Sequence, residues 1–130
     1  MSELPEHLRR GAKRAWTREI TEEDVARFAD LSGDRGRHHR ERDDRGRLMA
    51  HGLLTATLPT KIGGDLDYMA RTMAFEFLRP VFAGDTLTCE GVVESAAAQS
   101  TRFRVRFSFT VLNQDGEVVL RGTTSGQILR

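Results

Sequence analysis

The segment TRFRVRFSFTV, residues 101–111, alternates polar and apolar residues from Arg102 onward. Successive side chains of a β-strand point to opposite faces, so its apolar residues share one face and its arginines share the other. This pattern predicts a half-buried β-strand.

Further segments with a period of two lie on both sides of this strand. Residues 72–77 and 86–93 alternate in the same way, and residues 12–20 form a candidate leading strand. Asp115-Gly116 is a hairpin turn signal, and residues 117–129 return as the last strand. Because successive hairpins join antiparallel neighbours, the second half of the chain predicts an antiparallel sheet.

Two helices are expected in the first half of the chain. Thr21 and Asp24 have the spacing of a capping box, which predicts a short amphipathic helix over residues 22–32 that ends at Gly33. Residues 53–62 are apolar nearly all round and predict a buried helix that ends at Gly63-Gly64.

Pro59 lies inside this second helix and predicts a kink or a shorter helix, since an interior proline costs about 3 kcal/mol. One buried helix with an antiparallel sheet defines an α+β fold. We expect a single domain over residues 1–130, with residues 1–17 as a flexible start.

Composition excludes several classes of function. The 20 basic and 19 acidic residues leave a net charge of +1, which gives no overall attraction to nucleic acid. No run approaches the roughly 18 apolar residues of a membrane helix, so no membrane partner is expected. Cys89 is the single cysteine, which rules out an internal disulfide framework and favours a cytoplasmic location. Six arginines nevertheless fall within residues 35–47.

Candidate chemistry gathers around this arginine-rich segment. Asp34 and His39 are five residues apart after the first helix, and His51-Gly52 begins the buried helix. An Asp and a His can share general acid/base work on a water, and the free N–H groups of a first helical turn can polarise a carbonyl oxygen. The alternative is that Asp34 caps its loop and the histidines are solvated.

Three motifs carry a resemblance to a known family. They are Ser32-Gly33-Asp34 with His39 at the required spacing, Ala50-His51-Gly52-Leu53-Leu54, and Arg79-Pro80-Val81-Phe82-Ala83-Gly84-Asp85-Thr86-Leu87. In this order they resemble the MaoC-like dehydratases, which include the (R)-specific enoyl-CoA hydratases. The resemblance implies the hot-dog fold, an antiparallel β-sheet wrapped around a central α-helix.

The resemblance also implies an activity and its residues. Asp34 and His39 would activate a water for addition to a trans-2-enoyl thioester, or for the reverse dehydration, and the N–H of Gly52 would polarise the thioester carbonyl. Coenzyme A or an acyl carrier protein would carry the acyl group, with no metal and no other cofactor. A homodimer or a higher oligomer is implied. The expected substrate-binding residues are His51, Leu53, Thr60, Arg35 and Arg37.

One departure from the family pattern leaves alternatives open. The family's usual Asn-Pro is Gly36-Arg37 in this chain. A hot-dog thioesterase and a non-catalytic acyl-thioester-binding subunit therefore remain alternatives. We also hypothesise that Arg35, Arg37 or Arg40 contacts the carrier phosphates or a polar acyl group.

Overall fold

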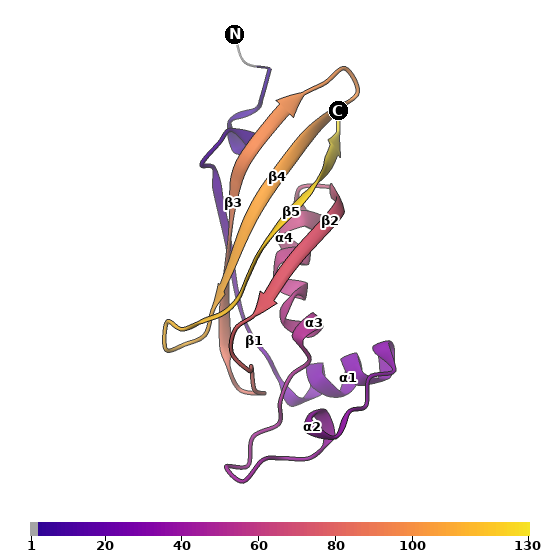
Figure 1. Ribbon diagram of the computed structural model, residues 1–130, viewed down its shortest axis with the longest axis vertical. Coiled ribbons are helices and arrows are strands. Elements are labelled where there is room, and N and C mark those ends of the chain that lie inside the picture. The colour runs from indigo at the N-terminus through magenta and orange to yellow at the C-terminus, as the bar shows by residue number, and fades with distance from the viewer. Residues whose placement is uncertain (1–2) are drawn as a thin grey trace.

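A single curved antiparallel sheet forms most of the computed structural model, which describes residues 3–130 (Figure 1). The strand order is β1-β3-β4-β5-β2, which confirms the expected antiparallel pairing. The five strands are β1 (Lys13–Glu19), β2 (Tyr68–Phe77), β3 (Thr86–Ala98), β4 (Arg102–Leu112) and β5 (Val118–Leu129).

The strand with the clearest alternation, β4, lies at the centre of the sheet. Val105, Phe107 and Phe109 are buried on its inner face, while Arg104 and Arg106 are exposed on the outer face. The predicted half-buried strand is therefore confirmed, and its apolar face is the floor of the core.

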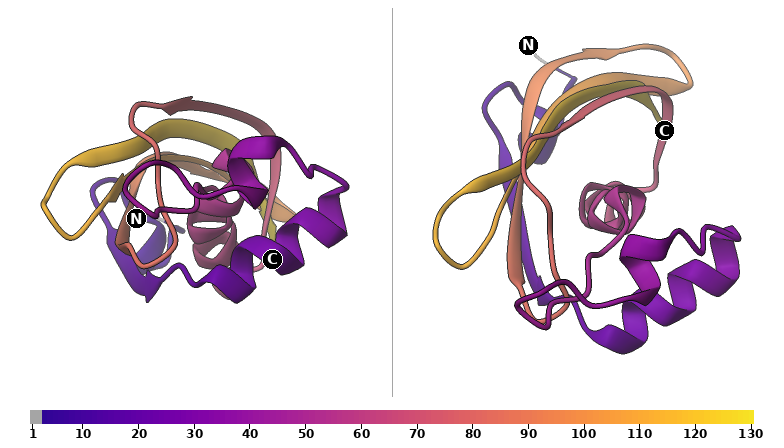
Figure 2. Two further views of the ribbon diagram at one scale, coloured as in Figure 1. Left: turned by 90° about the horizontal axis from the view of Figure 1, so that it is seen from below. Right: turned by 60° about the horizontal axis from the view of Figure 1, so that its bottom comes forward.

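The inner face of the sheet curls around a central helix (Figure 2). This helix is built from α3 (Gly52–Thr55) and α4 (Thr57–Asp65), and α4 contacts β1, β2 and β3. Leu58 and Ile62 of α4 are buried against the sheet. The arrangement of one buried helix inside an antiparallel sheet confirms the α+β fold and the hot-dog architecture.

The central helix is interrupted at Ala56, between α3 and α4. Pro59 is the third residue of α4 and so lies in its first turn, where a missing N–H costs no intrahelical hydrogen bond. Of the predicted kink or shorter helix, the structure shows the shorter helix: the break at Ala56 lies three residues before the proline and divides the segment in two.

Two further helices lie at one end of the sheet, beside the start of the central helix (Figures 1 and 2). α1 (Glu22–Ser32) has the predicted bounds and the reciprocal capping box of Thr21 and Asp24. Gly33 ends α1 in the left-handed conformation, with φ of 79°. α2 (Arg37–Arg40) is a single turn that the sequence pattern did not predict, because that segment has no apolar periodicity.

The start of the chain lies against the sheet in the part that the structure describes. Leu8, in a single 3₁₀ turn (Glu6–Leu8), is buried in the core, and the Gly11 N–H donates to the Val93 carbonyl. The described residues of this segment thus pack on the sheet, the flexible start expected over residues 1–17 stays a prediction, and residues 1–2 lie outside the described residues. Among residues 3–130, no helix is long and apolar enough to cross a membrane, and a cytoplasmic location stays a prediction.

Candidate active site

Asp34 lies on the loop that follows α1, and local hydrogen bonds fix its backbone. Its own N–H donates to the Ser32 hydroxyl at 3.0 Å, and its carboxylate accepts the Gly36 N–H at 3.1 Å. The carboxylate therefore closes a short turn that leads directly into α2. Its side chain is 56% exposed, so solvent reaches it.

His39 comes from α2 and is buried beside this turn. Its Nδ1 lies 2.8 Å from the Met49 carbonyl, which can only accept, so Nδ1 carries the hydrogen. In the neutral ring Nε2 is then a lone-pair acceptor, and it lies 3.6 Å from the Asp34 Oδ2 atom. The structure thus brings together the two residues that the sequence singled out.

His51, the residue before α3, lies behind this pair. Its ring stacks on the His39 ring with centroids 3.7 Å apart and an interplanar angle of 19°. Its Nε2–H donates to the Asp34 carbonyl at 2.8 Å. The side chain is buried, with 2% of the residue exposed, and Nδ1 has no hydrogen-bond partner in the described chain.

The electrostatics of the site keep Asp34 ionised. The Gly36 N–H donates to its carboxylate and, with smaller contributions from the neighbouring imidazoles of His39, His51 and His38, holds the pKa of Asp34 below its usual range. At neutral pH the Asp34 carboxylate is therefore an acceptor, and the Nε2 atom of His39 is an acceptor in the tautomer that the Met49 carbonyl selects.

These two acceptor atoms cannot hydrogen-bond to each other, because neither carries a hydrogen and they lie 3.6 Å apart. One water placed beside both can donate a hydrogen to each, which is the usual arrangement when polar groups face each other beyond hydrogen-bond distance. The pair is thus suited to hold and orient a single water, with a lone pair of its oxygen left free.

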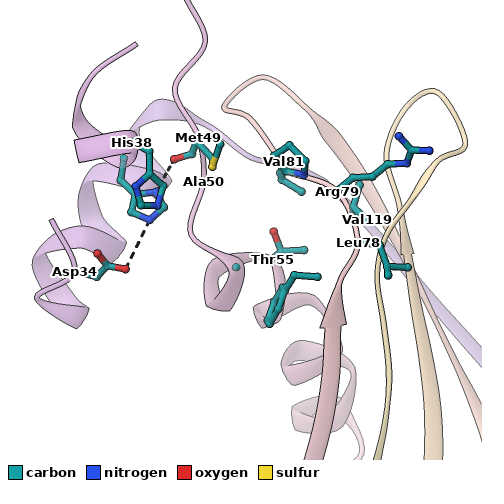
Figure 3. Close-up of a pocket in the computed structure, with 13 residues that line it drawn as sticks. Asp34, His38, Met49, Ala50, Thr55, Leu78, Arg79, Val81 and Val119 are labelled. Carbon is teal, nitrogen blue, oxygen red and sulfur yellow. Dashed lines mark hydrogen bonds and ion pairs between the residues drawn. The ribbon is translucent and has the colours of Figure 1, made fainter. Parts of the chain in front are cut away.

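A cavity of about 440 Å³ opens in front of this pair. In Figure 3, Asp34 and His38 lie on one side of it, Val81, Arg79 and Leu78 lie on the other, and Thr55 lies between them. The lining is Asp34, His38, His39, Met49, Ala50, Gly52, Thr55, Phe77, Leu78, Arg79, Pro80, Val81 and Val119. A polar wall with Asp34 and the histidines thus faces a mostly apolar wall.

Gly52 lies on the wall of this cavity as the first residue of α3. Within residues 3–130 its N–H has no hydrogen-bond acceptor, as expected for the first turn of a helix. A side chain at this position would meet the Phe77 ring, with 2.9 Å between an ideal Cβ and the Phe77 Cε1 atom. The glycine therefore leaves the backbone N–H accessible between the helix and β2.

Five expected substrate-binding residues do not line this cavity. Leu53 does not line it and is 64% exposed, because successive residues of a helix face different directions and Leu53 lies on a solvent-facing side. Thr60 lies about two turns further along the helix, beside a separate cavity of about 120 Å³, and its hydroxyl donates to the Ala56 carbonyl. His51 is buried and stacks on the His39 ring.

The remaining two, Arg35 and Arg37, pair with nearby acids. Arg35 forms an ion pair with Asp30 at 3.0 Å, and Arg37 forms one with Glu41 at 3.5 Å. Arg40 donates to the Arg35 carbonyl and does not line the cavity either. The cavity wall instead carries a different arginine, Arg79.

Sequence reasoning missed Thr55, Phe77 and Arg79 as cavity residues. Thr55 is buried one helical turn after Gly52, so its spacing of three from the glycine could have indicated it. Phe77 and Arg79 reach the cavity from the end of β2, which no local signal in the sequence connects with the helix start.

Asp34, His39 and His51 offer possible metal-ligating atoms within 4.8 Å of one another. Their geometry does not suit a shared ion. A cation lies in the plane of an imidazole that binds it, about 2.0–2.1 Å from the nitrogen for zinc. Since the two rings are stacked 3.7 Å apart, an ion in the plane of one ring would lie above the face of the other.

Known proteins share this architecture. A family model described as the thioesterase superfamily matches residues 48–119. The 3-hydroxybutyryl-CoA dehydratase of Methylorubrum extorquens is 34% identical over 128 residues, covering 90% of this chain and 78% of the relative.

Two solved structures of R-hydratases superpose on most of the chain. The unliganded R-hydratase PhaJ1 from Pseudomonas aeruginosa is 27% identical with a TM-score of 0.82, covering 95% of this chain and 86% of its own. The (R)-hydratase from A. caviae is 24% identical with a TM-score of 0.82, covering 94% and 98%, and supports the fold alone.

A curved sheet around a broken central helix, with an Asp–His pair that lines the same cavity as the start of that helix, defines a hot-dog domain with a candidate active site. The chain belongs to the thioesterase superfamily of hot-dog proteins. Within it, the relatives named above are a dehydratase and R-hydratases, which confirms the resemblance to the MaoC-like dehydratases.

Proposed function

We propose that this protein adds water to a trans-2-enoyl thioester to give a 3-hydroxyacyl thioester, and catalyses the reverse dehydration. One observation carries the proposal: the Asp34 carboxylate and the His39 Nε2 atom converge at 3.6 Å on the wall of a cavity that also exposes Gly52. The names of the dehydratase and hydratase relatives support the same reaction class.

The reaction follows from the positions of these groups. Asp34 and His39 each accept a hydrogen from one water, and one of them takes a proton as the water oxygen bonds to C3 of the substrate. The electrons of the C2–C3 double bond shift toward the thioester carbonyl, whose oxygen gains negative charge. The N–H of Gly52 stabilises that charge, and the pair returns a proton to C2. The net change is addition of H and OH.

Hydration of crotonyl-CoA tests this function directly through loss of the enoyl-thioester absorbance. We expect activity in the wild type and a loss of about 10²- to 10⁴-fold in kcat for Asp34→Asn and for His39→Gln. Asp44→Asn removes an exposed carboxylate of the same loop region outside the cavity and is the matched control. An inactive wild type, or full activity of Asp34→Asn, contradicts the mechanism.

The superfamily's name also makes thioester hydrolysis a candidate. A hot-dog thioesterase is expected to carry its carboxylate on the central helix. The one acid of α4, Asp65, is its last residue, pairs with Lys61, and does not line the main cavity. We therefore expect no release of free thiol from crotonyl-CoA or from butyryl-CoA. Thiol release without hydration would favour the thioesterase, and binding without turnover would favour the non-catalytic subunit.

The proposal includes a homodimer formed along β2. This strand is an edge of the sheet, and Met73 and Phe77 remain 56% and 51% exposed although they pair with inward-facing positions of β5. Apolar side chains left open beside an unpaired edge suit a second copy of the chain. Light scattering after gel filtration should give twice the monomer mass for the wild type and a monomer for Met73→Glu. A monomeric wild type would refute this arrangement.

A further inference from the structure

We propose that His51 is a positioning residue, which holds Asp34 and His39 in their mutual orientation without touching the substrate. Its ring contacts both members of the pair: it donates to the Asp34 carbonyl at 2.8 Å and stacks on the His39 ring at 3.7 Å. The kinetic effects expected from this role rest on the proposed hydratase function, whereas the hydrogen bond of His51 can be tested without activity.

Two neighbouring rings contact the His51 ring. His39 covers one side, and the Phe28 ring of α1 lies with its centroid 4.9 Å away at 54°. With 2% of the residue exposed and no part in the cavity lining, His51 cannot reach a bound acyl thioester. Its side chain therefore interacts with other residues of the protein and not with the substrate.

The position of His51 in the chain also connects two parts of the site. His51 directly precedes Gly52, so its backbone is continuous with the helix start that is proposed to bind the carbonyl. Its side chain meanwhile holds the loop of Asp34, 17 residues earlier. One residue thus links the water site and the carbonyl site, whose separation must match the C1–C3 span of the substrate.

The hydrogen bonds require opposite tautomers in the two stacked rings. His39 carries its hydrogen on Nδ1, toward the Met49 carbonyl, and His51 carries its hydrogen on Nε2, toward the Asp34 carbonyl. The Nδ1 atom of His51 is then a buried acceptor with no partner in the described chain.

The unpaired Nδ1 atom of His51 argues against a role in packing alone. A buried acceptor without a partner destabilises the folded state. A phenylalanine would fill nearly the same space and remove the unpaired Nδ1 atom, and it would lose only the hydrogen bond to the Asp34 carbonyl on its exposed loop, so packing alone does not account for a histidine here. The N–H directed at Asp34 does account for it.

Two substitutions divide the contacts of His51. His51→Phe keeps an aromatic ring on His39 and removes the N–H, whereas His51→Gln keeps an N–H near the Nε2 position and removes the ring. We expect His51→Phe to keep or raise the Tm, to lower kcat about 10- to 100-fold and to leave KM for crotonyl-CoA within about twofold. We expect His51→Gln to recover part of kcat. His7→Gln, an exposed histidine in the 3₁₀ turn at the chain start, is the matched control.

The alternatives give different kinetics. An unchanged kcat in His51→Phe overturns the proposal, and a raised KM with unchanged kcat assigns His51 to substrate binding. A lower Tm and a lower kcat that His51→Gln does not restore would show a packing role and also overturn it.

Long-range ¹H–¹⁵N NMR of the imidazoles in the wild type provides a test that needs no turnover. We expect His51 as the Nε2–H tautomer with a slowly exchanging proton, and neutral His39 as the Nδ1–H tautomer. The Nδ1–H tautomer of His51 would overturn the inference even if hydration is observed. If no thioester is hydrated, the proposed function fails, and the tautomers still decide whether His51 holds Asp34.

Discussion

The Phe77 ring lies directly against the backbone of Gly52, so that a Cβ added to the glycine would come within 2.9 Å of the Phe77 Cε1 atom. The two residues come from different elements, the end of β2 and the start of α3. Both line the cavity, so the ring forms the wall beside the N–H that is proposed to bind the thioester carbonyl. Only glycine allows this approach without a shift of the ring.

Gly52→Ala should therefore impair the reaction more than the fold. The added methyl group displaces the Phe77 ring or the start of α3 and narrows the route to the N–H. We expect a fall of about 10- to 100-fold in kcat/KM for crotonyl-CoA, measured by initial rates, with a folded protein by circular dichroism. The double variant Gly52→Ala/Phe77→Ala should recover part of this loss because the clash is removed.

Gly64→Ala is the matched glycine control. Gly64 is also helical, but a Cβ there meets nothing within 4 Å. We expect unchanged kcat/KM and a gain of about 0.5–1 kcal/mol in the free energy of unfolding, because alanine restricts the unfolded chain and favours the helix. Equal rates for the two single variants would show that the contact of Gly52 with Phe77 does not matter for the reaction.

The sequence was informative wherever one local rule decided the structure. The alternation of residues 102–111 predicted β4, and Thr21 with Asp24 predicted the start of α1. The spacing of Asp34 and His39 singled out a pair that the fold brings within 3.6 Å. It was not informative for Phe77, 25 residues after Gly52, because that contact depends on how far the sheet curls around the helix. The same limit applies to Arg79.

Arg79 provides the cation at the cavity wall that we expected from the arginine-rich loop. It is more than half exposed and pairs with Glu117 at 3.2 Å, so its guanidinium is accessible to solvent and does not pair with Asp34. A carrier phosphate could replace Glu117 as its partner. We expect Arg79→Ala to raise KM for crotonyl-CoA about tenfold, since a charge-assisted hydrogen bond contributes about 1.5–3 kcal/mol at most.

A truncated substrate distinguishes this contact from a general effect on the site. Crotonyl-N-acetylcysteamine has the thioester and no phosphate, so Arg79→Ala should leave its kcat/KM unchanged. Arg35→Ala removes an arginine outside the cavity and is the matched control for both substrates. If Arg35→Ala, and not Arg79→Ala, raises KM for the coenzyme A substrate, the arginine-rich loop holds the carrier after all.

Arg37→Pro tests whether the departure from the family's Asn-Pro pattern matters. Arg37 is the first residue of α2, where proline fits, and Gly36 before it has φ of −54° and ψ of 148°, an extended conformation that proline tolerates in its neighbour. No acceptor is paired with the Arg37 N–H in the described chain. The exposed ion pair with Glu41 contributes little.

Proline at this position should therefore stabilise the protein. We expect a gain of about 0.4–1 kcal/mol in the free energy of unfolding, measured in urea, because proline restricts the unfolded chain. The KM for crotonyl-CoA should not change, since Arg37 lies outside the cavity. Destabilisation would show that the turn between Asp34 and His39 differs from the geometry described above. A raised KM would show that Arg37 contacts the substrate after all.

The buried thiol of Cys89 makes the stability of the protein depend on pH in the alkaline range. The thiol is fully buried on the inner face of β3, and burial, with a smaller effect of Glu90, raises its pKa to about 12. An unfolded thiol has a pKa of about 8.5. The folded state holds this proton more tightly, so the contribution of Cys89 to stability is complete below about pH 8.5 and is lost as the pH rises toward 12.

Comparison with Cys89→Ala isolates this effect. Burial also raises the pKa of Tyr68, but that group is present in both proteins and cancels in the difference. We expect the stability difference between wild type and Cys89→Ala to shrink by up to about 1.4 kcal/mol for each pH unit above 8.5, measured by urea unfolding at pH 8, 9 and 10. A thiol reagent at pH 8 should label the unfolded chain once and leave the native protein unlabelled. A difference that stays constant with pH, or labelling of the native protein, would show that the thiol is accessible between β1 and β3.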